Sequence, residues 1–262
     1  MLTYSEPIHK LRWKFTGQRC FLMGNGPSLN KTRLELLADE IVWGFNKIYL
    51  LFNRIAWRPQ FYVTNDKRLT QNISKEIDVL IRQLPESIFF FPNHFLSNEV
   101  NSTYGNVYWY HEMPLNKQPS SNSILFSLDP SKFIVNTSTV TIVGLQLAVY
   151  LGFNPIYLIG CDTSYSIPAT VKFENENPEL LISTLDDDQN HFSPNYSGIG
   201  DKWSAPNVPL MVTQYMDAKK ALGESNVKVY NATVGGELEV FPRVEFESLF
   251  IKSPKSTVHS EI

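Results

Sequence analysis

The sequence predicts an α/β fold in which a mostly parallel sheet is covered by helices on both faces. Short, continuously apolar runs alternate with segments of helical periodicity along most of the 262 residues, as expected for buried parallel strands joined by helices. Several apolar runs end in polar or glycine-containing turns, which is typical of strands that end at a binding edge. The length suits a single domain over residues 1–262, with residues 163–208 as a lid or small subdomain.

The N-terminal half is expected to contribute four strands. They are predicted at Arg19–Met23, Ile41–Asn46, Gln60–Thr64 and Ser87–Phe91. After the first strand, Ser28 is placed to cap a helix that runs to about Leu37. Apolar residues at helical spacing predict a further helix over Leu69–Leu84. Pro92 stops the fourth strand, and scattered Pro, Asn and Ser predict irregular structure over Asn93–Lys132.

The strongest helix signal of the chain lies over Ser138–Leu151, and Gly152 ends it. A buried strand is predicted at Pro155–Gly160, and the polar, Pro- and Asp-containing stretch Tyr165–Asp201 is expected to form the lid. A last helix and a last strand are predicted at Pro209–Leu222 and Val227–Asn231.

Composition excludes several classes of protein. A hydrophobic fraction of 43% and a charged fraction of 19% predict a sizeable core rather than disorder. A net charge of -3 supplies no basic field for nucleic acid. Cys20 and Cys161 lie in apolar runs and are expected as buried free thiols in a reducing compartment. Residues 1–14 lack an apolar signal core and no segment is long enough to span a bilayer, so a cytoplasmic protein is expected.

The first strand leads into the turn Gly24-Asn25-Gly26-Pro27-Ser28. Glycines let a backbone approach a ligand closely, and a following helix N-terminus would point N–H groups at an anion. The turn therefore predicts a phosphate-binding corner for a nucleotide. Its spacing is neither the dinucleotide fingerprint, because Leu29 replaces the third glycine, nor a P-loop. A plain tight turn is the alternative interpretation.

Polar side chains follow four of the predicted strands. They are Asn25, Asn46, the pair Asn65 and Asp66, and Asp162. Each alone is a common turn residue, but the carboxyl ends of parallel strands meet at one edge, where ligands bind. Carboxamides both donate and accept hydrogen bonds, which suits a ribose hydroxyl, a base edge or a sugar. These side chains are therefore predicted to converge on one nucleotide.

Three further motifs carry candidate chemistry. The hydroxyl residues Thr137-Ser138-Thr139 open the strong helix, either as a plain N-cap or as a second anion cradle. His191 lies in the polar lid, where a packing role is less expected and proton transfer becomes plausible. The acidic run 186–188 is either a metal patch or a solvated loop, and no His and Cys spacing typical of a metal site is found.

Several of these segments together resemble bacterial CMP-sialic-acid-dependent sialyltransferases of the Campylobacter type. The resemblance extends from about residue 19 to 165 and is carried by Gly24–Leu29, Phe45–Asn46, Phe61–Asn65, Thr137–Ser138 and Leu151–Asp162. It implies a Rossmann-like domain with a lid, and a metal-independent transfer that needs no cofactor beyond the CMP-sugar donor. A glycan acceptor is implied as the other partner; a lipid-linked glycan would bring the protein to the inner membrane, and a homo-oligomer is left open.

The same resemblance implies roles for individual residues. Contacts with the CMP moiety are implied for Asn25, Asn46 and Asn65, and contacts with the sugar carboxylate or phosphate region for Thr137 and Ser138. His191 would be the base, although the family has two close histidines where this sequence has one. Tyr165 and Tyr196 are candidates to steady the leaving phosphate, and Thr139 stands where the family has glycine.

A second resemblance leaves two alternatives open. Gly24–Leu29 together with Leu151–Asp162 is also similar to the hydroxymethylpterin diphosphokinase-like domain, which is related to flagellin glycosylation factors. This resemblance implies an enzyme that needs ATP and Mg²⁺, with the metal held by acids such as Asp66 and Asp162. The other alternative is a domain that binds a nucleotide or glycan without turnover. The leading hypothesis is an inverting glycosyltransferase that takes an acidic sugar from a CMP-activated donor.

Overall fold

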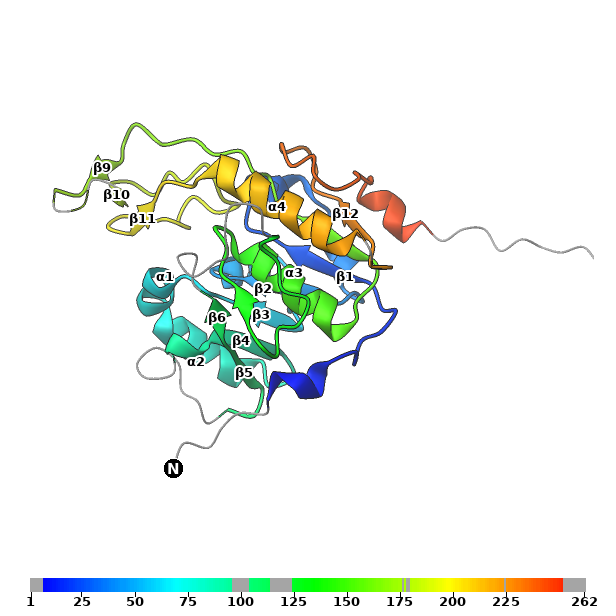
Figure 1. Cartoon of the computed structure of the whole chain (residues 1–262). Helices are drawn as coiled ribbons and strands as arrows, with labels where there is room; N and C mark the ends of the chain where they lie inside the picture. The colour runs from blue at the N-terminus through cyan, green and yellow to red at the C-terminus, as the bar shows by residue number, and fades with distance from the viewer. Residues whose placement is uncertain are drawn as a thin grey trace, which may run out of the picture.

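The computed structural model describes residues 7–95, 104–113, 124–175, 177, 180–223 and 225–251. Within these ranges, seven parallel strands form the main sheet in the spatial order β12-β8-β1-β2-β3-β4-β5 (Figure 1). The strands are β1 (Cys20–Met23), β2 (Val42–Phe45), β3 (Phe61–Val63), β4 (Ile88–Pro92), β5 (Val107–Tyr110), β8 (Ile156–Ile159) and β12 (Val229–Asn231). The predicted parallel, Rossmann-like α/β architecture is confirmed.

The strand order reverses beside β1. The chain runs outward from β1 to β5 and then returns to place β8 on the other side of β1, with Met23 level with Ile159. When the chain leaves two adjacent parallel strands toward opposite edges of the sheet, a crevice forms at the carboxyl ends of those strands, and ligands of open α/β sheets bind there. The loops after β1 and β8 therefore frame the expected site.

Helices cover both faces of the sheet. The α-helices are α1 (Lys67–Asn72), α2 (Ser74–Gln83), α3 (Val140–Leu151) and α4 (Val208–Leu222). Alternate strand residues face opposite layers: Leu22 and Trp43 pack with α3 and α4, whereas Phe21 and Val42 pack with α2 and the short helical turns. Because α3 is buried on nearly every side, it is apolar all round rather than amphipathic.

The prediction of a helix after the first strand is wrong. In its place are two 3₁₀ turns, η2 (Pro27–Lys31) and η3 (Leu34–Leu37). Ser28 lies inside η2, and its hydroxyl bonds Asp162 instead of capping a helix. Further 3₁₀ turns are η1 (Ile8–Leu11), η4 (Ile48–Leu51), η5 (Asn93–Phe95) and η7 (Glu247–Phe250).

The expectation of irregular structure over 93–132 is confirmed for residues 124–132, but it is wrong at 93–95, 107–110 and 112–113, where a 3₁₀ turn and two strands form. The run Val107–Tyr110 forms the edge strand β5, because its β-branched and aromatic residues pair with β4. The adjoining β6 (Glu112–Met113) pairs with β7 (Ile134–Val135). The predicted helix over 69–84 is two helices that meet at Ile73.

The other expected elements are confirmed with small changes at their ends. Helix α3 begins at Val140 with Thr139 as its N-cap, and Gly152 ends it at a φ of 92°, a conformation that favours glycine. The segment 163–208 holds a separate antiparallel sheet of β9 (Lys172–Phe173), β10 (Leu180–Ile182) and β11 (Lys202–Ser204), which projects beyond the main sheet (Figure 1). No helix among the described residues has the length and apolarity needed to cross a membrane.

Candidate functional site

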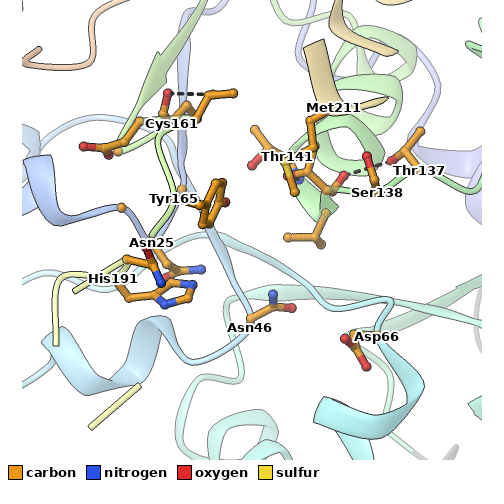
Figure 2. A pocket seen from close by; sticks show the side chains of 18 of the residues that line it. Asn25, Asn46, Asp66, Thr137, Ser138, Thr141, Cys161, Tyr165, His191 and Met211 are labelled. Carbon is orange, nitrogen blue, oxygen red and sulfur yellow. Dashed lines mark hydrogen bonds between the residues drawn. The ribbon is translucent and has the colours of Figure 1, made fainter. Parts of the chain in front are cut away.

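A cavity of about 430 Å³ opens at the carboxyl edge of the main sheet (Figure 2). We call it the sheet-edge cavity. It brings together most of the residues that the sequence singles out, namely Gly24, Asn25, Gly26, Asn46, Asn65, Asp66, Thr137, Ser138, Asp162, Tyr165, His191 and Tyr196. Pro27 and Ser28, also predicted as ligand contacts, do not line it. Residues from four strand ends, the start of α3 and the segment 163–208 thus surround one space.

The glycines after β1 are explained by a close approach between two loops. A Cβ on Gly24 would lie 2.4 Å from the carbonyl oxygen of Gly160, and one on Gly26 would lie 1.8 Å from Asp162 Oδ2. The amides of Gly24 and Gly26 donate to the carbonyls of Ile159 and Gly160, at 2.8 and 2.9 Å. These glycines therefore make room for the β8 loop, whereas the sequence interpretation had them make room for a ligand.

Asp162 occupies the corner where a phosphate was expected. Its carboxylate accepts hydrogen bonds from the Ser28 amide at 3.1 Å and the Ser28 hydroxyl at 2.6 Å. Burial raises the pKa of Asp162, although the Ser28 hydrogen bonds oppose that rise. Since Ser28 already binds this carboxylate, the donors predicted to hold a phosphate here are engaged within the protein.

The strand-end asparagines present hydrogen-bond acceptors. Asn25 donates from Nδ2 to the Phe45 carbonyl at 3.1 Å. Among the described residues, neither its Oδ1 nor that of Asn46 has a donor, although both oxygens are buried from solvent. Asn46 adopts a φ of 50°, a conformation that asparagine tolerates better than most residues. Two buried carboxamide oxygens at this edge of the sheet are therefore left without a donor from the described residues.

The hydroxyl cluster at α3 is largely engaged in holding the helix start. Gln214 Oε1 accepts from both the amide and the hydroxyl of Ser138, at 2.8 and 2.6 Å. Thr137 donates to the Thr139 carbonyl, and Thr139 Oγ1 accepts from the Thr141 amide. The first turn of any helix leaves backbone N–H groups without an intrahelical acceptor, so this end of α3 remains the stronger candidate for an anion.

His191 forms a dyad with Asp188. Its Nδ1 lies 2.8 Å from Asp188 Oδ2, and the Asp188 side chain is only 4% exposed. Burial would raise the pKa of Asp188, but hydrogen bonds and the nearby imidazole outweigh it and hold that pKa below its usual range. An ionised carboxylate accepts hydrogen bonds only, so Nδ1 donates to Asp188 and Nε2 is the ring nitrogen left outside this bond.

The imidazole is held on its other side by Tyr196. The two rings stack with centroids 3.7 Å apart and planes inclined by 9°. Backbone contacts dock the same loop on the first strand's turn, because the Phe192 amide donates to the Asn25 carbonyl at 2.9 Å. His191 is thus fixed at the cavity wall beside Asn25, as Figure 2 shows.

The acidic run 186–188 is neither a metal patch nor a uniformly solvated loop. Asp186 accepts from the Ile199 amide, Asp187 from the Thr170 hydroxyl, and Asp188 from His191. The described residues hold no group of three His, Cys, Asp or Glu side chains able to bind a metal ion. The role of Asp188 was missed, although its spacing of three residues from His191 could have revealed it.

The two tyrosines occupy different positions. Burial raises the pKa of Tyr165 to about 12 and also raises that of Tyr196, so both hydroxyls stay protonated at neutral pH. Tyr196 is 6% exposed and serves as a platform for His191, whereas Tyr165 projects toward the middle of the cavity (Figure 2). Tyr165 is therefore the better placed hydroxyl donor for a ligand.

Lys47, which sequence reasoning missed, connects the end of β2 to the loop that carries His191 and Tyr196. Its buried ammonium donates to the Tyr196 carbonyl and to Asp201 Oδ2, both at 2.7 Å. Asp201 lies 154 positions away along the chain, so no local pattern signals this pair. The contact anchors the loop that carries His191 and Tyr196.

A second cavity of about 420 Å³ adjoins the first. We call it the β11 cavity because Trp203 and Ser204 of β11 line it, with α1 residues on the other side. The two cavities share a wall made of Asn46, Asp66, Ser138, Tyr165, Asn190, His191, Tyr196 and Met211. His191, with its hydrogen bond to Asp188, therefore stands on the wall between two adjoining cavities.

Comparisons with known proteins add two findings. Over 95% of its length the chain is similar in structure to the MAf glycosyltransferase from Magnetospirillum magneticum AMB-1, with a TM-score of 0.53 and 19% identity, and it spans 37% of that protein. This likeness supports the fold, and no curated protein matches the sequence. Residues 2–168 match the family model described as 6-hydroxymethylpterin diphosphokinase MptE-like.

The family match bears on the two resemblances seen in the sequence. It supports the diphosphokinase-like resemblance, while the Campylobacter-type sialyltransferase resemblance stays a prediction. The match covers well over half of the 262 residues and includes β1, α3, β8 and the loops that frame the sheet-edge cavity. The chain therefore belongs to the 6-hydroxymethylpterin diphosphokinase MptE-like family.

Proposed function

We propose that this protein is a glycosyltransferase that moves an acidic sugar from a CMP-activated donor to a glycan hydroxyl. The observation that carries the proposal is the Asp188–His191 dyad on the wall between two adjoining cavities. A transferase needs a base where donor and acceptor meet, and it needs room for both substrates. The fold shared with a glycosyltransferase is consistent with this assignment.

In this proposal the donor occupies the sheet-edge cavity. Asn25 and Asn46 line this cavity, and a turn of either carboxamide would bring its buried, unpaired Oδ1 within reach of a ribose or base group, while the start of α3 faces the anionic part of the donor. Tyr165 donates a hydrogen bond to the leaving phosphate. No lysine or arginine lines this cavity within the described part of the chain, so hydroxyls and helix amides take the place of cations.

The transfer follows as a direct displacement. The acceptor oxygen attacks the anomeric carbon while the bond from that carbon to the phosphate oxygen breaks, and the electron pair leaves with CMP. Nε2 of His191 takes the proton of the acceptor hydroxyl, and Asp188 stabilises the imidazolium that forms. The sugar carbon is inverted, and His191, not a metal ion, supplies the base.

Two measurements test this proposal. The first is a thermal-shift panel of CMP, UDP, GDP and ATP with and without Mg²⁺, in which CMP should raise the melting temperature without the metal. The second is the rate of CMP release from CMP-sialic acid. In His191→Gln this rate should be about 10²–10⁴-fold lower than in the parent protein, while the affinity for CMP should stay unchanged. Absence of CMP binding, or full activity in His191→Gln, would refute it.

A diphosphokinase-like activity is the second candidate, favoured by the family match and by the two acids at the cavity. Asp66 and Asp162 both line the sheet-edge cavity, where they could face Mg²⁺. Against this assignment, Ser28 engages both oxygens of Asp162, and Asp66 accepts from the Leu69 amide as the cap of α1. Stabilisation by ATP only with Mg²⁺, together with AMP release in the presence of a pterin alcohol, would favour this candidate.

A further inference from the structure

The β11 cavity differs in chemistry from its neighbour. Its separate lining includes the apolar residues Leu69, Trp203, Ala205 and Pro206, beside several amides and hydroxyls and the charged residues Lys47, Arg68, Asp188, Asp201 and Lys202. The indole Nε1 of Trp203 donates to Ser183 Oγ at 3.0 Å, which holds the side chain in place. A fixed aromatic side chain among many polar and charged groups suits a small polar ring such as a sugar.

Among the residues that the structure describes, one cation that lines this cavity has no protein partner. Lys47, Arg68 and Lys202 line it. Lys47 is bound to Asp201 and Lys202 to Glu174. Among the described residues, the Arg68 guanidinium makes no hydrogen bond or ion pair, and the neighbouring Asp66 is engaged as the cap of α1.

Arg68 is therefore suited to an anionic group of a ligand. A guanidinium presents parallel N–H donors that match a carboxylate or a phosphate, and it loses little solvation on binding one. Arg68 on α1 and Trp203 on β11 both line this cavity, so both are available to a ring bound there. The far side of that space is the shared wall with His191.

We propose that the β11 cavity is the acceptor subsite and that it takes a sugar that carries an anionic group. Arg68 binds that group, Trp203 packs against the ring, and an acceptor hydroxyl faces Nε2 of His191. The proposal rests on the proposed transferase function, because it names the substrate class for the second half of that site. It commits to a sugar with a carboxylate or a phosphate, and the test distinguishes the two.

The test measures sugar binding to the whole chain without any donor. Methyl β-D-glucuronide, methyl β-D-glucoside 6-phosphate and the neutral methyl β-D-glucoside are titrated by calorimetry, together with the corresponding galactose series. At least one anionic sugar should bind about tenfold more tightly than its neutral counterpart, as one charge-assisted contact provides. The series that shows the preference identifies carboxylate or phosphate as the recognised group.

Matched variants place the effect at Arg68. Arg68→Gln should lower the affinity for the anionic sugar to that of the neutral one. Lys67→Gln removes the neighbouring charge from the same helix without lining either cavity, so it should change nothing. Trp203→Ala should weaken binding of neutral and anionic sugars alike.

Three results would overturn the proposal. Equal affinity for anionic and neutral sugars in both series would show that the cavity does not recognise an anionic group on the sugar. Equal effects of Lys67→Gln and Arg68→Gln mean a diffuse charge effect rather than a site. Weaker CMP binding in Arg68→Gln assigns this cation to the donor. Sugar binding is measured without nucleotide, so a protein that binds anionic sugars but no CMP would contradict the transferase function alone.

Discussion

Replacing Lys47 with Met should test whether a buried charge holds the loop of His191 in place. Methionine keeps much of the apolar stem but removes both donors, leaving the Tyr196 carbonyl and the Asp201 carboxylate without this partner. Asp201 keeps a hydrogen bond from the Gly198 amide at 3.2 Å. The substitution therefore removes the link from β2 to the loop while the loop's own turn contacts remain.

The cost follows from the burial of the two partners. A hydrogen bond to a charged group contributes about 1.5–3 kcal/mol when buried. The Lys47 side chain is 10% exposed, but that of Asp201 is 32% exposed, so solvent screens part of the ion pair. We expect a loss of about 2–4 kcal/mol in the free energy of unfolding, or about 5–12 °C in melting temperature for a chain of this size.

The assay is thermal unfolding followed by circular dichroism, with a double-mutant cycle. Lys202→Met is the matched control, because it breaks a more exposed pair with Glu174 in the same region and should cost under about 1 kcal/mol. Combined with Asp201→Asn, Lys47→Met should show a coupling of about 1 kcal/mol or more. Additive effects, or a shift no larger than that of the control, would refute the clamp.

Three further outcomes are expected. Gly26→Ala should lower the free energy of unfolding by about 1–3 kcal/mol, measured by urea unfolding, because its Cβ would lie 1.8 Å from Asp162 Oδ2; unchanged stability would contradict the loop packing. The lowered pKa of Asp188 adds stability above the unfolded value of about 3.9 that disappears as pH falls through the folded pKa. Asp188→Asn should therefore lower the melting temperature at pH 7, and its difference from the parent should shrink as the pH falls below about 3.9. A difference that stays constant with pH would exclude this linkage. Burial raises the pKa of Glu112 to about 7, so the melting temperature should fall as the pH rises from about 4.3 through 7 and this carboxyl group ionises. Glu112→Gln should make that fall smaller. A pH profile unaltered by the substitution would contradict the raised pKa.

Helices and strands marked by apolar runs, helical spacing or turn residues could be predicted from the amino-acid sequence. Buried parallel strands read as continuous apolar runs because both faces of the sheet are covered, and β1, β2, β3 and β8 were predicted for that reason. The end of α3 was predicted because Gly152 takes a left-handed conformation that other residues avoid. Polar residues at strand ends were predicted to meet because parallel strands share one edge, and the sheet-edge cavity contains them.

The polar groups of the cavity that stay available to a ligand depend on contacts between distant parts of the chain, and these are seen in the folded structure alone. Ser28 and Asp162 are 134 positions apart, and their hydrogen bonds occupy the corner that local sequence suggested for a phosphate. Lys47 meets Asp201 across 154 positions, and the strand order decides that the loop of His191 rests beside Asn25. Periodicity and turn chemistry act over a few residues and so can be read along the chain. Hydrogen-bond partners far apart in sequence are selected by packing, which no single segment encodes.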